Sequence, residues 1–127
     1  EVKSDPRVVN LENTDARSLN NRIIIDPVDL IVCDVSFISV KKILPPCMAL
    51  SKTGGNLLCL FKPQFEVGPG KLKKTGVITD VDLQIKLLKQ MENWFLNLKD
   101  WKFKGSIRSS LPGREGNKEF FLLAEKL

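Results

Sequence analysis

Two short apolar runs constrain the fold of this chain more than any other feature of its sequence. Residues 29–35 (DLIVCDV) and 56–61 (NLLCLF) carry apolar side chains at both odd and even positions, without the alternation of a half-buried strand. A strand of this kind is covered on both faces, as in a parallel sheet that lies between layers of helices. The two runs therefore predict an α/β fold in which the strand at 29–35 is central.

The first half of the chain predicts two further elements. Residues 8–11 (VVNL) form a short apolar run that ends in a turn-forming segment, which predicts another strand. Residues 39–50 carry apolar side chains on one helical face, but Pro45 and Pro46 interrupt that face, so we expect a kinked or restarted helix. The glycines at 54–55 are expected to end this helix.

The second half predicts one long helix and a closing pair of strands. Apolar side chains recur at helical spacing over residues 83–98, and Thr79 or Asp80 can cap the start of that helix. Residues 101–109 alternate as a strand, and a short turn leads to a buried strand at 119–124, so this pair should be antiparallel. The order of elements predicts an open, mostly parallel sheet with an antiparallel terminal strand.

The composition fits one soluble globular domain. The chain has 127 residues, of which 43% are hydrophobic and 28% are charged, so it can bury one core and differs from disordered or fibrous chains. Its longest apolar runs have the length of strands, far below the roughly 20 residues that cross a bilayer. The sequence therefore argues against a membrane span.

The three cysteines, Cys33, Cys47 and Cys59, argue against both a metal site and a secreted protein. They form no CxxC pair, and the chain contains no histidine that could complete a zinc site. Their odd number, and the place of two of them inside apolar runs, favour reduced thiols and a cytoplasmic location.

A mild excess of positive charge is compatible with a polyanionic partner. The net charge is +5 and the isoelectric point is about 9.2, values that many cytosolic proteins share. Part of the charge lies in a long glycine-containing loop at 66–78, which carries Lys71, Lys73 and Lys74. The charge alone does not demonstrate contact with a nucleic acid, and the loop could simply be a solvated one.

Three charged residues follow or precede the predicted strands at one edge of the sheet. Asp34 lies at the end of the first apolar run, Lys62 follows the second, and Glu119 opens the terminal strand, which starts where the others finish. Because the ligand crevice of an open α/β sheet lies at this edge, we expect the three side chains to converge. Two acids and a lysine can hold a hydroxyl group and move its proton.

Each of these residues also has a structural interpretation. Asp34 could cap the segment after its strand, as aspartates in turns do, and Asp15 could be a turn residue. Acids before a terminal strand, such as Glu119, are common. Lys62 is harder to explain in this way, because its position between an aromatic residue and a proline limits its freedom. Gln64 could face either solvent or a substrate.

Four segments resemble the hemolysin A (TlyA) family of ribosomal RNA methyltransferases: DPRVVNLENTDAR, DLIVCDVSFIS, LFKPQFEVG and GNKEFFLL. The resemblance covers essentially the whole chain, and DVSFIS together with KPQFE is a specific pair. Proteins of this family carry an FtsJ-like 2′-O-ribose methyltransferase domain behind a small S4-type RNA-binding domain. The resemblance implies a partial Rossmann-like, S-adenosylmethionine-dependent methyltransferase fold, with residues 1–127 as its C-terminal portion and the S4 domain and first strands upstream.

The resemblance also implies roles for individual residues. Asp34, Lys62 and Glu119 match the aspartate, the second lysine and the glutamate of the Lys-Asp-Lys-Glu tetrad of this class. The first lysine has no match in this chain, and neither does the glycine-rich loop after the first strand that grips S-adenosylmethionine. Asp15 matches the acidic position that faces the adenine of the cofactor, and Asp34 would lie close to its methionine end.

The implied reaction is methyl transfer from S-adenosylmethionine to a ribose 2′-hydroxyl group of ribosomal RNA. The hydroxyl oxygen must lie in line with the methyl group and lose its proton as the bond forms. Lys62 could remove that proton, a role that a second lysine nearby would favour. Alternatively, the carboxylate of Asp34 could keep Lys62 charged, and Lys62 would then stabilise the developing oxyanion.

Two other classes of function stay open beside the enzyme. The chain could be a non-catalytic RNA-binding module that uses Lys71, Lys73 and Lys74. It could also be a hemolysin-like, membrane-active protein, although the long helix at 83–98 has the pattern of a core helix. As a fragment, the chain is expected to be inactive alone and to self-associate through an exposed sheet edge.

Overall fold

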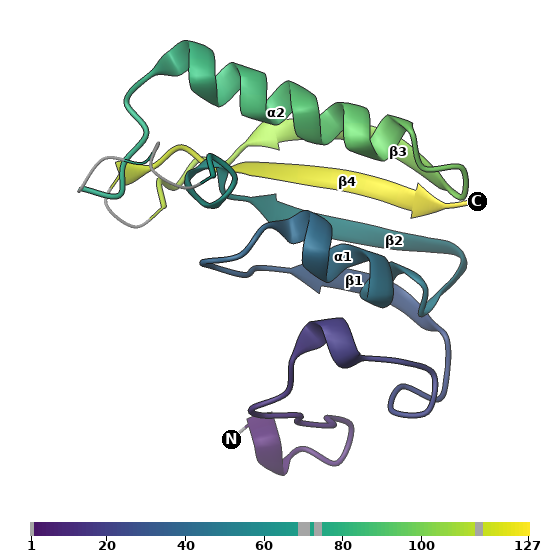
Figure 1. Cartoon of the computed structure of the whole chain (residues 1–127). Helices are drawn as coiled ribbons and strands as arrows, with labels where there is room; N and C mark the ends of the chain where they lie inside the picture. Colours follow the sequence, from purple (N-terminus) through teal and green to yellow (C-terminus); the bar gives the residue numbers. More distant parts are fainter. Residues whose placement is uncertain (1, 69–71, 73–74, 114–115) are drawn as a thin grey trace.

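The computed structural model of the chain describes residues 2–68, 72, 75–113 and 116–127, and Figure 1 shows its elements. Within these residues, four strands form one sheet, accompanied by two α-helices and three short 3-10 helices. The strands are β1 (Val28–Cys33), β2 (Ser51–Phe61), β3 (Trp101–Arg108) and β4 (Phe120–Lys126). The α-helices are α1 (Val40–Met48) and α2 (Val81–Leu96), and the 3-10 helices are η1 (Val2–Ser4), η2 (Ala16–Ser18) and η3 (Pro63–Phe65).

The sheet is mixed, with the strand order β1-β2-β4-β3. β1 and β2 are parallel, whereas β4 is antiparallel to both of its neighbours, β2 and β3. The α/β fold and the antiparallel closing pair are therefore confirmed. Of the three strand pairings, however, only one is parallel, so the described sheet is mixed rather than mostly parallel.

The strand predicted at residues 8–11 is absent, and this changes the place of β1. Residues 8–11 form no strand in the structure, and Val9 is 78% exposed. A segment becomes a strand only when a neighbour pairs with its backbone groups, and none of the described strands lies beside this one. The prediction of a central β1 was therefore wrong: in the described sheet β1 is an edge strand (Figure 1).

Helix α1 runs without interruption through Pro45 and Pro46, so the restarted helix, one of the two expected outcomes, was wrong. A proline removes the hydrogen bond from its own nitrogen to the carbonyl four residues earlier. Those carbonyls belong to Lys41 and Lys42, two exposed residues of the first helical turn, where water can replace the missing donors. Ser39 caps the helix, because its side chain accepts a hydrogen bond from the Lys41 nitrogen.

The glycines at 54–55 do not end α1, which stops at Met48, but lie inside β2. The pairing between β1 and β2 shifts here, from Val28 opposite Ser51 to Leu30 opposite Asn56. Gly54 has a φ of +82°, a backbone conformation that side chains disfavour. The two glycines therefore lie where the pairing of β1 with β2 is irregular, and Gly54 adopts the backbone conformation found there.

Helix α2 begins as predicted. The carboxylate of Asp80 accepts hydrogen bonds from the nitrogens of Asp82 and Leu83, so Asp80 is the cap. The apolar face that the periodicity predicts is buried at Leu87, Met91 and Phe95. Among the described residues, no helix has both the length and the apolar character that crossing a membrane requires.

The two α-helices lie on the same face of the sheet (Figure 1). Five buried apolar residues of β2 and β4 point to that face: Leu57, Cys59, Phe61, Leu122 and Ala124. The residues between them point to the other face, where large apolar side chains are exposed: Leu30, Val32, Leu58, Ile107 and Leu123. We call this second set the open face. The core is therefore one-sided in the described part of the chain.

Candidate functional site

The three predicted charges lie at one edge of the sheet. β1 and β2 are parallel and end together, so Asp34 and Lys62 follow neighbouring strand ends. β4 is antiparallel to β2 and starts at the same edge, where Phe120 pairs with Phe61. Glu119 therefore lies directly before β4, across from the end of β2.

Asp34 and Lys62 form an ion pair. The Nζ atom of Lys62 lies 2.5 Å from Oδ1 of Asp34, and it also donates a hydrogen bond to Oγ of Ser36 at 3.2 Å. The side chain of Lys62 is only 14% exposed, whereas that of Asp34 is 67% exposed. The ammonium group is thus held largely inside the edge of the sheet, with the carboxylate on its solvent side.

Glu119 joins this group indirectly. Its side chain is buried, and its Oε2 accepts a hydrogen bond of 2.9 Å from Nε2 of Gln64. Among the described residues, Gln64 is the side chain that meets this carboxylate, and Glu119 forms no ion pair with Lys62. The structure therefore brings Asp34 and Lys62 together directly, and it links Glu119 to them through the turn that begins at Pro63.

Glu66 connects the turn that carries DVSFIS to the turn that carries KPQFE through hydrogen bonds. Its Oε2 accepts a hydrogen bond of 2.7 Å from Oγ of Ser39, and its Oε1 accepts one of 3.0 Å from the nitrogen of Val40. Glu66 thus satisfies a free N–H group at the start of α1 and places a negative charge at the positive end of the helix. The turn after β2 and the turn after β1 are held together as one unit.

Phe37 is the most unusual residue of this unit. It has a φ of +66°, and its side chain is 84% exposed. A non-glycine residue in this region costs on the order of 1 kcal/mol or more, and such residues cluster at functional sites. The ring packs on that of Phe65 with a centroid distance of 5.0 Å. An aromatic ring is thus presented to solvent beside Ser36 and the ion pair.

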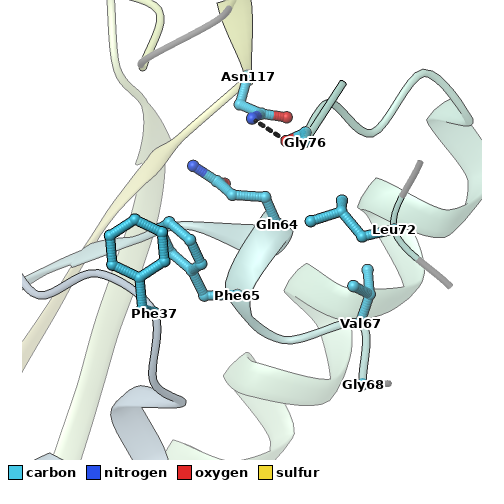
Figure 2. A pocket seen from close by; sticks show the side chains of 8 residues that line it. All are labelled: Phe37, Gln64, Phe65, Val67, Gly68, Leu72, Gly76 and Asn117. Atoms are coloured by element: carbon cyan, nitrogen blue, oxygen red, sulfur yellow. Dashed lines mark hydrogen bonds between the residues drawn. The ribbon is translucent and has the colours of Figure 1, made fainter. Parts of the chain in front are cut away.

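A pocket of about 440 Å³ opens next to the two rings (Figure 2). Its lining is mainly apolar: Phe37, Gln64, Phe65, Val67, Gly68, Leu72, Gly76 and Asn117. The amide of Asn117 is already used, because Oδ1 accepts from the nitrogen of Ile78 and Nδ2 donates to the carbonyl oxygen of Gly76. The pocket has the size and character that suit a flat, largely apolar group with a few polar atoms.

A second pocket, of about 450 Å³, follows the free edge of β1 between η2 and α1. Its walls are largely apolar, with residues from both faces of β1 on one side and Asp34 at one end. Ala16, the neighbour of Asp15, also lines it, whereas Asp15 does not. Asp34 therefore faces this second pocket while its carboxylate contacts Lys62.

Asp15 is engaged with Arg17. Its carboxylate accepts hydrogen bonds from the nitrogen of Arg17 at 2.9 Å and from Nη2 of the guanidinium at 2.7 Å. These hydrogen bonds lower the pKa of Asp15 from its ordinary value to about 2. Asp15 also caps η2. Its contacts in this structure are therefore those of a turn residue. The predicted basic residues Lys71, Lys73 and Lys74 lie outside the described residues.

The model of the family described as FtsJ-like methyltransferase matches residues 1–126. The chain belongs to the FtsJ-like methyltransferase family. Its α/β arrangement is accordingly that of a Rossmann-like S-adenosylmethionine-dependent methyltransferase, and the resemblance noted in the sequence is confirmed.

Individual proteins with known names are similar to this chain over nearly its whole length. The 16S/23S rRNA (cytidine-2′-O)-methyltransferase TlyA of Mycobacterium tuberculosis is 40% identical over 121 residues, which are 95% of this chain and 45% of that protein. Hemolysin A of Brachyspira hyodysenteriae is 37% identical over 125 residues, with 94% of this chain and 50% of that protein covered. The chain thus spans about half the length of the curated relatives it matches.

A solved structure agrees with these sequence relatives. The crystal structure of a candidate hemolysin from Lactococcus lactis superposes with a TM-score of 0.89 at 30% identity, over 98% of this chain and 59% of that one. The FtsJ-like chain therefore shares its arrangement of strands and helices with a protein that carries additional sequence.

Sequence reasoning missed several residues of this FtsJ-like site. The sequence alone assigns no role to Ser36, Phe37 or Glu66, and it leaves Gln64 open between solvent and substrate. All four residues belong to the motifs DVSFIS and KPQFE, which the sequence singles out. Side chains of the two motifs contact each other in the structure. Only the structure shows that the two motifs touch.

Proposed function

We propose that this chain provides the acceptor side of an S-adenosylmethionine-dependent methyltransferase that acts on a ribose 2′-hydroxyl group of ribosomal RNA. One observation carries the proposal: the ion pair of Asp34 with the nearly buried Lys62, at the edge of the sheet where an α/β fold binds its ligands. Membership of the FtsJ-like family and the names of the TlyA relatives support this class of reaction.

Lys62 acts on the acceptor oxygen. In the structure its Nζ atom lies 2.5 Å from Oδ1 of Asp34 and donates a hydrogen bond to Oγ of Ser36. This arrangement supports the role of a cation that stabilises the developing oxyanion. The alternative role is that of the base that takes the proton of the hydroxyl group. Glu119, held by Gln64, supplies the second carboxylate of the site.

The acceptor nucleotide enters the pocket beside Phe37 and Phe65. Enzymes that read single nucleotides of RNA stack the base on aromatic side chains, and the exposed ring of Phe37 offers such a surface next to the ion pair. The TlyA relatives are named as cytidine-2′-O-methyltransferases, so we take cytidine as the acceptor. Lys71, Lys73 and Lys74 could contact flanking phosphates, a proposal that rests on their charge alone.

The pocket along β1 fits the cofactor in part. Its apolar walls suit an adenine ring, and the carboxylate of Asp34 at its end suits a positively charged group. S-adenosylmethionine supplies the electrophilic methyl group when it is bound. Asp15 could reach the adenine only if its carboxylate exchanged the contacts that it now makes with Arg17.

The test uses a chimera, because the chain matches only part of its relatives. The M. tuberculosis TlyA enzyme receives this chain in place of its matching segment, and transfer of labelled methyl groups to ribosomal RNA is measured. We expect Lys62→Ala to lower the rate about 100-fold or more, as the loss of an oxyanion-stabilising group does, with the affinity for RNA changed less than about threefold.

Lys52→Ala is the matched control. Lys52 also pairs with an aspartate of β1, Asp29, but both side chains are exposed and the pair lies near the start of β2. This variant should retain activity within about threefold, as the loss of an exposed ion pair predicts. Substantial methyl transfer by the Lys62→Ala chimera would refute the assignment of Lys62.

A further inference from the structure

Gln64 lies between the candidate catalytic groups and the pocket. It is the middle residue of η3, two positions after Lys62, and only 5% of it is exposed. Its Nε2 donates a hydrogen bond to Glu119, and its side chain lines the pocket beside Phe37 and Phe65 (Figure 2). Gln64 is therefore the side chain that connects Glu119 with this pocket.

The orientation of the Gln64 amide is set by Glu119. Nε2 of the amide donates to Oε2 of the carboxylate, so the NH₂ group faces Glu119 and the carbonyl oxygen points away from it. The carboxylate is itself buried, with 7% of Glu119 exposed, and it lies directly against Gly113. The carbonyl oxygen of Gln64 thus has a fixed direction.

That carbonyl oxygen is buried and has no hydrogen-bond partner among the described residues. Buried polar atoms are almost always paired, so an unpaired one calls for an explanation. The other amide of the pocket, Asn117, has both of its ends engaged with backbone groups. A ligand with a hydrogen-bond donor would satisfy the unpaired carbonyl oxygen of Gln64.

We propose that Gln64 selects the acceptor base: its NH₂ group holds Glu119, and its carbonyl oxygen accepts a hydrogen bond from the exocyclic amine of cytosine. This inference rests on the proposed function. Uracil carries an oxygen in place of that amine, so it would set two acceptors against each other. A site built to pair with a donor rejects the analogue that lacks it.

The experiment compares acceptor RNAs in the chimera described above. One transcript has cytidine at the methylated position and the other has uridine, and kcat and KM are measured for both. The wild-type chimera should favour cytidine about tenfold or more in kcat/KM. Gln64→Met, which keeps the length of the side chain, should reduce this preference to less than about threefold. It should also lower kcat on cytidine about tenfold, because Glu119 loses its partner.

Gln84→Met provides the matched control. Gln84 is also a buried glutamine, 6% exposed, and its Nε2 donates a hydrogen bond of 2.8 Å to the carbonyl oxygen of Ile78, away from Glu119. This variant should keep the full preference for cytidine. Equal preference for cytidine in the wild type and in Gln64→Met would overturn the inference while leaving the proposed function intact. A wild-type chimera that methylates neither RNA would overturn both.

Discussion

At the scale of single residues, Asp15 and Arg17 show how a predicted ligand can be occupied by its own neighbour. The guanidinium and the nitrogen of Arg17 both donate to the carboxylate, which lowers the pKa of Asp15 to about 2. A lowered pKa means that this pairing is complete above the ordinary value of 3.8 and is lost as the pH falls through about 2. At neutral pH, Asp15 is therefore charged and paired.

Arg17→Ala should raise the pKa of Asp15 from about 2 toward its ordinary value of 3.8, because the donors of the guanidinium are lost. A titration of the side-chain carboxyl group by carbon NMR measures this directly. Asp5 provides an internal control, since it is paired in the same way with Arg7 and its pKa should not change. A pKa of Asp15 that stays near 2 in the variant would contradict the assigned cause.

At the scale of elements, the turn after β2 positions the start of α1. Glu66 accepts one hydrogen bond from Ser39 and one from the nitrogen of Val40, although these residues are 27 and 26 positions away. Both hydrogen bonds are partly buried, so neither donor is easily satisfied by water. The segment between β1 and α1, which carries Asp34 and Phe37, is thereby tied to the segment that carries Lys62.

Glu66→Ala should lower the free energy of unfolding by about 1–3 kcal/mol, because it leaves the helix start and Ser39 without their acceptor. Chemical denaturation followed by circular dichroism measures the loss. Glu92→Ala is the control: Glu92 accepts one exposed hydrogen bond from Ser106, and its replacement should cost less than about 1 kcal/mol. Equal losses for the two variants would show that Glu66 has no special role.

At the scale of the whole molecule, the described residues cover the sheet on one side only. The open face carries apolar side chains from all four strands, and Val32 and Ile107 are 69% and 70% exposed. The outer edge of β1 pairs with none of the described strands. Large apolar patches and free strand edges favour association, so we propose that two copies of the chain meet here.

Light scattering after size exclusion should therefore show dimers or larger species of this chain at high concentration. Val32→Lys should shift the population toward monomers, because a lysine on the open face opposes burial of that face. Leu96→Lys is the control, since Leu96 is similarly exposed, at 65%, but lies on α2. A wild-type chain that is monomeric at high concentration would exclude the association.

The amino-acid pattern was a good guide wherever the structure depends on neighbouring residues. The helix that starts at Asp80, the strand at 101–108 and the antiparallel closing pair are local arrangements, and capping groups and periodicity report them. The order of Asp34, Lys62 and Glu119 along the strand ends likewise predicts that they lie at one edge of the sheet. Their chemical roles stay proposals.

The predictions from the amino-acid pattern were wrong where contacts between distant segments decide the position of a strand or the continuity of a helix. An apolar run such as 29–35 has the same composition in a central strand and in an edge strand, and the number of neighbours cannot be read from the run itself. The prolines of α1 leave the carbonyls of Lys41 and Lys42 without helical donors, and the exposure of these two residues, which lets water replace the donors, is a property of the folded chain.

The chain's residue pattern thus suffices for the two α-helices, the strands of the described sheet and the charged residues at the strand ends, because these depend on short stretches of side chains. Tertiary structure alone joins Gln64 to Glu119, 55 positions apart, and turns a carbonyl oxygen into an unpaired acceptor beside a pocket. Hydrogen bonds act only over about 3 Å, so a contact of this kind exists only once folding has brought the two backbone segments together.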